Sequence, residues 1–336
     1  LGVPQHQVKF VADAIEKEMK ASGKGLITKA DLAAYKPAMR KPVRGSYRGY
    51  EIISMSPPSS GGTHVIEILN ILEGYNMTRL GFQTPESLHL MAEAMKRAFA
   101  DRAKFMADTD FVKVPIDGLI SKKYAEELRK GISMDTVGTK IPAGNPLPFV
   151  GSGGTSHLSV IDKQGNIVAL TQTINYFFGS GVLVPGTGIM LNNEMDDFNP
   201  KPGTSNSVEP KKRPLSSMTP TIMLKNGKPF LSVGSPGATR IISALSQIIV
   251  NVVDFRMNIQ DAIEAPRIHC MTGDIFMESR FPQATQDALT AKGHKLNVRG
   301  AMDLYFGGAQ GVMISPTLGL LYGAGDPRRD GAAVGY

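Results

Sequence analysis

A single change of hydrophobic period near the middle of this 336-residue chain constrains its fold more than any other feature. Before the change, apolar residues recur at helical spacing, as in the stripe Leu88, Met91, Met95 and Phe99. After it, they occur in short runs that are typical of strands. The change falls in residues 135–154, which are rich in Gly, Pro and Thr and typical of an exposed connector. The sequence therefore predicts a first portion made mostly of helices and a second portion built on strands.

Two β-hairpins are predicted beyond the connector. The first joins strands 155–162 and 167–173, the second joins strands 219–224 and 229–233, and both turns contain Asn and Gly. A long apolar helix over 239–253 follows them. This order predicts an α/β layered domain in which antiparallel hairpins pack on helices. Further elements are predicted at 8–19, 28–35, 50–55, 65–72, 283–292, 311–315 and 318–322, together with a helix that begins at Thr84 and Pro85.

Composition and charge exclude several classes of protein. An apolar fraction of 42% rules out intrinsic disorder, and a single cysteine, Cys270, rules out a disulfide scaffold. No run reaches the ~18 apolar residues of a membrane span, so we expect none in this chain. The net charge of +7 is not gathered into a stripe, because the longest basic run is Lys211 to Arg213, and we expect no nucleic-acid partner. The chain starts at Leu1 without a leader-like stretch, which we interpret as a processed or trimmed product.

Most common catalytic motifs are missing from the sequence. It contains no Walker loop, no HExxH, no Gly-x-Ser-x-Gly and no CxxC pair. The six histidines include no pair at i, i+4, so we expect no metal site, and nothing indicates a cofactor. Cys270 follows His269, but neighbours on a strand point to opposite faces, so we interpret Cys270 as a small apolar residue.

The informative position is Thr155, which directly follows the glycines of the connector and begins a predicted strand. A threonine hydroxyl is a weak nucleophile inside an intact chain. If the Gly154–Thr155 bond is cut, however, the hydroxyl gains its own α-amine as a general base. The alternative is a glycine loop that leads into a strand rich in Thr and Ser.

Three further segments offer polar groups. Residues 192–197 concentrate acceptors that suit an ammonium group or a cation, although such side chains also cap ordinary turns. Ser216 and Ser217 offer adjacent hydroxyls, which equally form a plain turn. Gly237 and Ala238 lie between a strand and a helix, where backbone N–H groups can face a developing oxyanion.

Taken together in this order and spacing, these segments resemble the γ-glutamyltranspeptidase family of N-terminal nucleophile hydrolases. The resemblance covers nearly the whole chain after about residue 10. It rests on Gly-Gly-Thr-Ser-His-Leu-Ser-Val (153–160), Thr-Gln-Thr-Ile-Asn (171–175), Leu-Asn-Asn-Glu-Met-Asp-Asp-Phe (191–198), Lys-Arg-Pro-Leu-Ser-Ser-Met-Thr-Pro-Thr (212–221), Gly-Ser-Pro-Gly-Ala (234–238) and, upstream, Ala-Phe-Ala-Asp-Arg (98–102).

The resemblance implies an α+β fold, a four-layer αββα sandwich. It also implies a precursor that cuts itself between Gly154 and Thr155. Residues 1–154 would then be the C-terminal portion of a large subunit and residues 155–336 a small subunit, and the two would stay associated in one shared fold. Relatives of this kind are commonly periplasmic or secreted, which implies the same for this chain.

The resemblance further implies that Thr155 attacks the γ-carbonyl of a γ-glutamyl donor such as glutathione. Water, an amino acid or a peptide then accepts the γ-glutamyl group. The implied roles are orientation of Thr155 by Thr173, oxyanion binding by Gly237 and Ala238, ammonium binding by Asn175, Glu194 and Asp197, and carboxylate binding by Ser216 and Ser217.

The sequence also departs from the family. Members carry a substantial segment ahead of what is Leu1 here, with an arginine that clamps the α-carboxylate, and no residue of this chain can be assigned to that role. Ala238 stands where many members have Gly, a change that is tolerated unless the backbone needs a positive φ. The stretch after Phe198 is short, which predicts an open site without a lid. Two alternatives stay open: an amidase similar to cephalosporin (glutaryl) acylases, and an inactive, truncated scaffold.

Overall fold

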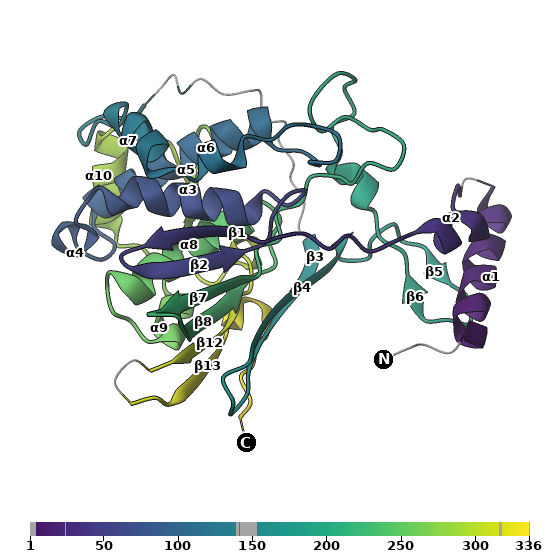
Figure 1. The fold of residues 1–336 in the computed structure, drawn as a ribbon. Coiled ribbons are helices and arrows are strands. Elements are labelled where there is room, and N and C mark those ends of the chain that lie inside the picture. The colour runs from purple at the N-terminus through teal and green to yellow at the C-terminus, as the bar shows by residue number, and fades with distance from the viewer. Residues whose placement is uncertain (1–4, 24, 139–140, 142–152, 316–317, 336) are drawn as a thin grey trace.

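The computed structural model describes residues 5–23, 25–138, 141, 153–315 and 318–335. Its centre is a six-stranded sheet in which every neighbouring pair is antiparallel (Figure 1). The strands follow the order β1 (Val43–Tyr47), β2 (Tyr50–Ser54), β7 (Thr221–Lys225), β8 (Lys228–Gly234), β12 (Gln310–Ile314) and β13 (Leu321–Gly325). The sheet therefore combines strands from both portions of the chain.

Three long helices cover one face of this sheet: α3 (Gly61–Glu73), α5 (Pro85–Phe105) and α8 (Arg240–Val253) (Figure 1). The predicted start of α5 is confirmed, because Thr84 Oγ1 accepts a hydrogen bond of 3.2 Å from the Ser87 amide and Pro85 is the first helical residue. Apolar side chains of all three helices join those of the sheet in one core. The core is thus shared by the two portions.

The hairpin of β3 (Gly153–Ile161) and β4 (Ile167–Tyr176) packs on the other face of the sheet. Ser159 Oγ and Ser232 Oγ are 2.8 Å apart across this contact. Gly234 permits the close approach, because a Cβ atom at this position would lie 2.2 Å from Nδ1 of His157. The outer face of the hairpin carries Leu158 and Val168, each 53% exposed. A helical layer and two packed sheets are therefore present among the described residues.

Smaller elements complete the described fold. One group, which stands apart at the right of Figure 1, packs helix α1 on the β5–β6 pair through Ile15, Met19 and Val184. The remaining elements are α1 (Gln5–Ser22), α2 (Lys29–Ala34), α4 (Met77–Leu80), α6 (Ile116–Leu119), α7 (Lys122–Lys130), β5 (Leu183–Val184), β6 (Ile189–Met190), the 3-10 turn η1 (Glu194–Asp197), α9 (Ile259–Glu264), β9 (Ile268–His269), β10 (Ile275–Glu278), α10 (Gln283–Ala291), β11 (Leu296–Arg299), η2 (Leu304–Phe306) and η3 (Pro327–Arg329).

The predicted order of helices and hairpins is confirmed, with bounds shifted by a few residues. The predictions missed strand β1, because Arg44, Gly45 and Ser46 carry no strand signal. Gly45 is needed there for packing, since a Cβ atom would lie 2.5 Å from the side chain of Ile66 on α3. Most of the predicted connector lies outside the described residues.

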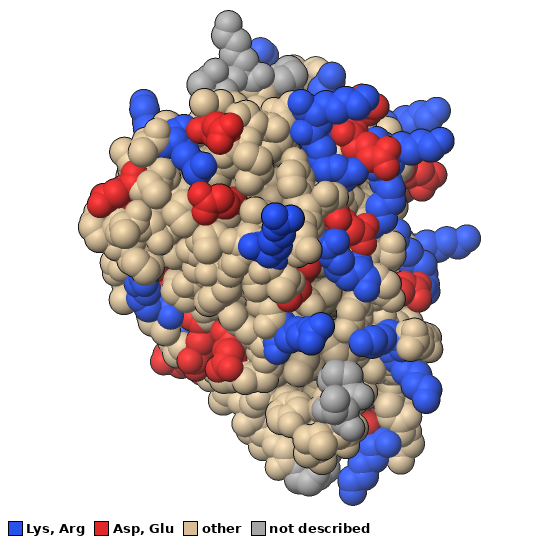
Figure 2. Space-filling view, turned by 90° about the vertical axis from the view of Figure 1, so that its left-hand side faces the viewer, with Lys and Arg blue, Asp and Glu red and all other residues tan. Residues whose placement is uncertain are grey.

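Figure 2 shows basic and acidic side chains interspersed on the face that it presents. Among the described residues, no helix combines the length and the apolar character that crossing a membrane requires.

Candidate active site

Thr155 and Thr173 face each other at the start of the β3–β4 hairpin. They are register partners, and their Oγ1 atoms are 3.0 Å apart. Thr173 Oγ1 also accepts a hydrogen bond of 2.8 Å from the Asn175 amide, which fixes its position. The register of the hairpin shifts between Gly153 and Thr155, so the ladder is irregular immediately before the threonine.

Glu194 and Asp197 form a pair of neighbouring carboxyl groups on η1. Burial raises the pKa of Glu194 to about 7, and the neighbouring charge of Asp197 and a hydrogen bond to it add to the shift. Burial also raises the pKa of Asp197 to about 6, against the opposing effect of Arg102. Glu194 Oε1 is buried without a hydrogen-bond partner among the described residues. Such a pair suits a cationic ligand, because an added positive charge favours ionisation of both groups.

Asn175 connects the end of β4 to this carboxyl pair. Its φ of +69° places it in the left-handed region, which Asn adopts more readily than most residues. Its side-chain amide donates to the Asn193 carbonyl oxygen over 3.3 Å. Asn192 supports the same turn, because its Oδ1 accepts a 2.9 Å bond from the Glu194 amide. The asparagines of this segment therefore shape the turn, while the carboxyl groups form no ion pair with a described residue.

The two serines are held by different partners. Ser216 Oγ accepts a hydrogen bond of 3.1 Å from the Met218 amide, as in an ordinary turn. Ser217 Oγ accepts a bond of 3.0 Å from Nη2 of Arg102, whose Nε donates to Ser60 Oγ over 2.8 Å. The predictions gave Arg102 no role, because a lone arginine on a helix carries no sequence signal of its own.

The Gly237–Ala238 turn adopts a strained backbone. Gly237 has a φ of +133° and Ala238 a φ of +50°. The backbone at residue 238 therefore adopts a positive φ, which is the condition under which alanine is disfavoured there. Neither amide donates a hydrogen bond to another described residue. Ala238 lies at the cavity described below, whereas Gly237 is buried behind it. Both N–H groups therefore lack a partner among the described residues, but only Ala238 lines the cavity.

These residues surround one cavity of about 580 Å³. Its walls come from both portions of the chain, because Phe99, Arg102 and Met106 line it together with residues of the second portion. The stretch after Phe198, whose shortness predicts an open site without a lid, forms one wall of this cavity. Of the predicted site residues, Thr155, Thr173, Asn175, Glu194, Asp197, Ser216, Ser217 and Ala238 line the cavity.

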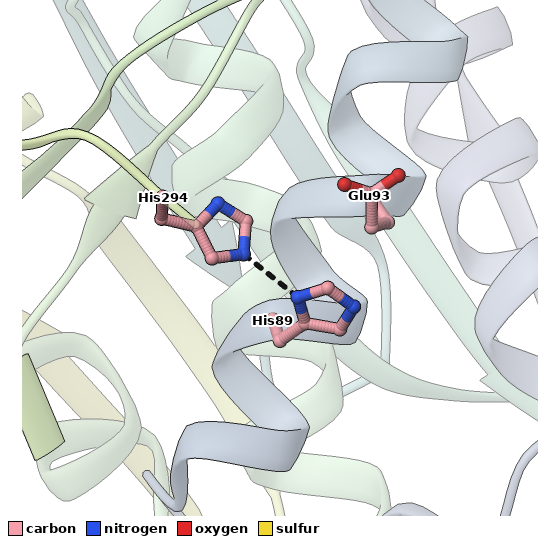
Figure 3. Close-up of side chains that lie close together, drawn as sticks. All are labelled: His89, Glu93 and His294. Atoms are coloured by element: carbon pink, nitrogen blue, oxygen red, sulfur yellow. Dashed lines mark hydrogen bonds between the residues drawn. The ribbon is translucent and has the colours of Figure 1, made fainter. Parts of the chain in front are cut away.

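A second polar cluster lies away from this cavity. His89, Glu93 and His294 come close enough to share an ion (Figure 3). The expectation of no metal site rested on the absence of histidine pairs at i, i+4, whereas His89 and Glu93 are a His and a Glu at that spacing. Here Nδ1 of His89 and Nε2 of His294 share a hydrogen bond of 2.7 Å.

The carboxylate of this cluster is already neutralised. Glu93 forms buried ion pairs with Lys96 and with Arg97, so a divalent cation would have to displace both. Nε2 of His89 is also occupied, because it lies 2.8 Å from the Ser133 carbonyl oxygen. The cluster is therefore a hydrogen-bonded link between the two portions of the chain, and it does not offer a metal a free set of ligands.

Comparison with known proteins gives a consistent result. The family model described as gamma-glutamyltranspeptidase matches residues 9–336. The chain is 45% identical to the glutathione hydrolase proenzyme of Escherichia coli (strain K12), over 97% of this chain and 58% of that protein. It is 47% identical to the acylase ACY 1 proenzyme of Pseudomonas sp. (strain SE83), over 96% of this chain and 56% of that protein. The chain therefore spans little more than half the length of these relatives.

A solved structure extends the match to the fold. The crystal structure of cephalosporin acylase from Bacillus halodurans superposes with a TM-score of 0.85 at 33% identity, over 96% of this chain and 57% of that one. This similarity confirms the predicted α+β fold class of the N-terminal nucleophile hydrolases, to which the helical layer and the two packed sheets belong. The sequence match and the shared fold place the chain in the gamma-glutamyltranspeptidase family.

Proposed function

We propose that the protein is a γ-glutamyl transferase and hydrolase that cleaves the γ-glutamyl amide bond of glutathione and related donors. The observation that carries this proposal is the pair Glu194 and Asp197, which line the cavity beside Thr155 and form no ion pair with any described residue. An α-ammonium group would supply the missing positive charge. Because buried carboxyl groups are costly without a partner, the pair favours a substrate that carries a cation.

Activation begins at the Gly154–Thr155 bond. Its hydrolysis leaves a carboxylate on Gly154 and a free α-amine on Thr155, which then acts as general base for its own hydroxyl. The irregular register before Thr155 supports this site of cleavage, because a bulge takes a peptide group out of the regular ladder. The cut would divide the chain into residues 1–154 and 155–336.

The proposed reaction has two steps. Thr155 Oγ1 attacks the γ-carbonyl carbon while its proton passes to the α-amine, and Thr173 holds the hydroxyl in place. The amides of Gly237 and Ala238 stabilise the oxyanion, each by about 3 kcal/mol. The leaving amine takes the proton, and a γ-glutamyl ester remains on Thr155. Water or an amino-acid or peptide acceptor then attacks the ester and restores the hydroxyl.

The rest of the cavity would hold the donor. Asn175, Glu194 and Asp197 are assigned to its α-ammonium, and Ser216 and Ser217 to its α-carboxylate. The spacing of these groups around one cavity supports the assignment. Every group that takes part in this reaction belongs to the protein or to one of the substrates.

A second candidate is an acylase that acts on glutaryl amides. Its support is the similarity to acylase ACY 1, which is as strong as the similarity to glutathione hydrolase. A glutaryl group lacks the α-ammonium, however, and would leave Glu194 and Asp197 unpaired. An inactive scaffold is also disfavoured, because it would not need the contact between the hydroxyls of Thr155 and Thr173.

We propose that the two products stay associated after the cut. The shared core and direct bonds between the portions support this, for example Ser60 Oγ to the Ser216 carbonyl oxygen at 2.8 Å. By family resemblance we also propose a periplasmic or secreted location.

Denaturing gel electrophoresis of the full chain tests the activation step. We expect two fragments, the larger of which begins at Thr155, and we expect Thr155→Ala to abolish both the cut and the turnover of a γ-glutamyl anilide. Ser156→Ala, at the next position, is a matched control that should still be cut, since Ser156 is exposed. An uncut parent chain after long incubation would refute self-cleavage.

A γ-glutamyl anilide and a glutaryl anilide, compared at equal concentration, test the substrate. The proposed function requires faster release from the γ-glutamyl compound. Addition of glycylglycine then separates transfer from hydrolysis. Faster release from the glutaryl compound would replace the proposal with the acylase.

A further inference from the structure

The turn before α8 holds its carbonyl oxygens with protein donors and leaves its amides without acceptors. The Pro236 carbonyl oxygen accepts a hydrogen bond of 2.7 Å from Ser235 Oγ. The Gly237 carbonyl oxygen accepts one of 3.1 Å from the Arg240 amide. The amides of Gly237 and Ala238 donate to no other described residue. Because each carbonyl shares a peptide group with the amide that follows it, both peptide groups are anchored at their oxygen and open at their nitrogen.

Anchoring a carbonyl oxygen also fixes the direction of the amide. Both peptide groups of the turn are trans. A trans peptide group is planar, and its C=O and N–H bonds point to opposite sides. The first turn of α8 therefore directs the Ala238 amide, through the backbone of Arg240. The Gly237 amide is directed by a side chain, that of Ser235.

The Pro236–Gly237 peptide group needs this support. Its plane turns about ψ of Pro236 and φ of Gly237, and glycine tolerates more than one orientation because it lacks a Cβ atom. The φ of Gly237, +133°, already lies in a region that other residues rarely adopt. The backbone alone thus permits a rotated peptide group, in which the Pro236 oxygen takes the place of the N–H. An oxygen in that place would repel the negative charge that the N–H stabilises.

Ser235 is itself held by the loop that precedes β12. Its side chain is fully buried, and its Oγ accepts a hydrogen bond of 3.2 Å from the Gly308 amide. The loop packs directly on the peptide group, since a Cβ atom at Gly307 would lie 2.6 Å from the Pro236 oxygen. Neither glycine is among the described residues that line the cavity. Ser235 therefore holds the Pro236 oxygen on the side of a loop that is not part of the cavity wall.

We propose that Ser235 is a positioning residue whose hydroxyl holds the Pro236–Gly237 peptide group with its N–H directed toward the oxyanion. This inference rests on the proposed function, which assigns the Gly237 amide to the oxyanion. Ser235 lies outside the cavity wall and acts only through the backbone. It keeps a hydrogen-bond donor where negative charge develops. The Ala238 amide does not depend on Ser235, because α8 holds its peptide group.

Ser235→Ala removes the hydroxyl and leaves the rest of the turn in place. We expect kcat for the γ-glutamyl anilide to fall about 10- to 100-fold, because one of two oxyanion donors is no longer held in place. KM should change by less than about threefold, since no group that binds the donor is altered. Ser235→Cys should recover part of kcat, because a thiol is a weak donor and a weak acceptor.

Two inhibitors separate the oxyanion from the rest of the substrate. The γ-boronic acid analogue of glutamate forms a tetrahedral adduct with a threonine hydroxyl and places an oxygen where the oxyanion forms. L-Norvaline carries the same α-groups, with a methyl group in place of the boronic acid. Ser235→Ala should weaken inhibition by the boronic acid about 10- to 100-fold and that by norvaline less than about threefold. Equal weakening of both inhibitors, or no weakening of either, would overturn the inference.

Ser246→Ala is the matched control. Ser246 is also fully buried, and its Oγ also donates to a backbone carbonyl oxygen, that of Ile242 at 2.9 Å, but it lies within α8 and outside the cavity wall. The control should change kcat and both inhibition constants by less than about twofold. A loss of kcat as large as that of Ser235→Ala would mean that any buried serine hydroxyl has this effect, and would refute the specific role of Ser235.

The stability of the variants is checked by melting curves. If Ser235→Ala does not fold, Ser235→Cys carries the same comparison, and it should weaken inhibition by the boronic acid alone, by about three- to tenfold. Equal inhibition constants for Ser235→Cys and the parent would then contradict the inference.

The outcome for Ser235 is separable from the outcome for the proposed function. A parent protein that prefers the glutaryl anilide would refute the γ-glutamyl assignment, yet that reaction forms the same oxyanion, so Ser235→Ala should lower its kcat by a similar factor. A parent that releases neither anilide would refute the proposed function altogether. A crystal structure of Ser235→Ala then tests the inference: we expect the Pro236 oxygen to turn toward the cavity, and an unchanged orientation of this peptide group would refute the role of Ser235.

Discussion

At the scale of single residues, the charge state of the cavity depends on two carboxyl groups. Burial raises the pKa of Glu194 to about 7 and that of Asp197 to about 6, which places their ionisation close to neutral pH. Below these values the protonated carboxyl groups cannot pair with an ammonium ion. Above them, both are anionic and attract it.

The pH dependence of turnover follows from these values. We expect kcat/KM for a γ-glutamyl anilide to rise between about pH 6 and pH 7 as Glu194 and Asp197 ionise. The α-amine of Thr155 also titrates and affects every substrate, so a glutaryl anilide, which lacks the ammonium, serves as the reference. The ratio of the two rates should rise with pH. A ratio that is independent of pH would show that the carboxyl groups do not bind the ammonium.

A second residue, Ala238, illustrates how opposing effects nearly cancel. A left-handed backbone costs an L-residue about 1–2 kcal/mol, whereas glycine at the same position loses about 0.5–1 kcal/mol through the entropy of the unfolded chain. The net free-energy cost of alanine relative to glycine at a φ of +50° is therefore small. Its amide stays available, so the change from Gly does not remove the oxyanion donor.

At the scale of elements, the β3–β4 hairpin positions the nucleophile, and the large sheet positions the hairpin. The contact depends on Gly234, whose α-carbon approaches the ring of His157. That ring is itself held between Thr171 Oγ1 at 2.8 Å and Ser159 Oγ at 3.0 Å. These two bonds fix the ring within the hairpin, and the contact between Ser159 Oγ and Ser232 Oγ at 2.8 Å joins the hairpin to the large sheet.

Gly234→Ala should therefore disturb the site from a distance. The added Cβ would lie 2.2 Å from Nδ1 of His157, and we expect a loss of about 1–3 kcal/mol in the free energy of unfolding, with slower cleavage before Thr155. Gly273→Ala is the control, since a Cβ there meets no atom within 4 Å, and it should change stability by less than about 0.5 kcal/mol. Urea unfolding of both variants measures the difference. Equal stability of the two would contradict the role of this contact.

At the scale of the whole molecule, the two portions are joined by a shared core and by buried polar links. One of these links is the hydrogen bond between His89 on α5 and His294 in the second portion. Burial lowers the pKa of His294 to about 4, with further contributions from His89 and Lys96. The folded protein therefore keeps His294 neutral at pH values where the unfolded chain protonates it. Stability from this residue is fully present above about pH 6.5 and is lost as the pH falls toward 4.

His294→Gln tests this link, because glutamine can still bond to His89 but does not titrate. We expect the variant to be less stable than the parent at pH 8, and we expect the difference to shrink by up to about 1.4 kcal/mol per pH unit below pH 6.5. Urea unfolding of the full chain at pH 8, 6.5 and 5 provides the measurement. A difference that stays constant over this range would mean that His294 does not contribute to the loss of stability in acid.

Local signals in the sequence predicted much of this molecule. The change of period and the turns that contain Asn and Gly located the helical portion and both hairpins, since these signals depend on a few neighbouring residues. Other features depend on contacts between distant segments. Strand β1 carries no alternation, and its Gly45 is explained only by the helix that packs on it. The His89–Glu93–His294 cluster likewise needs two segments about 200 residues apart.

The sequence by itself determined the order of the elements and the residue types that the site requires, because both follow from the spacing of neighbouring residues. The tertiary structure alone decided which of those residues share a cavity, how their pKa values shift and which charges stay unpaired. Burial and distance set these properties, and neither is a property of a short segment. Arg102 shows the difference most clearly: in the sequence it is one arginine on a helix, and in the fold it is a cation beside Ser217 without an acidic partner among the described residues.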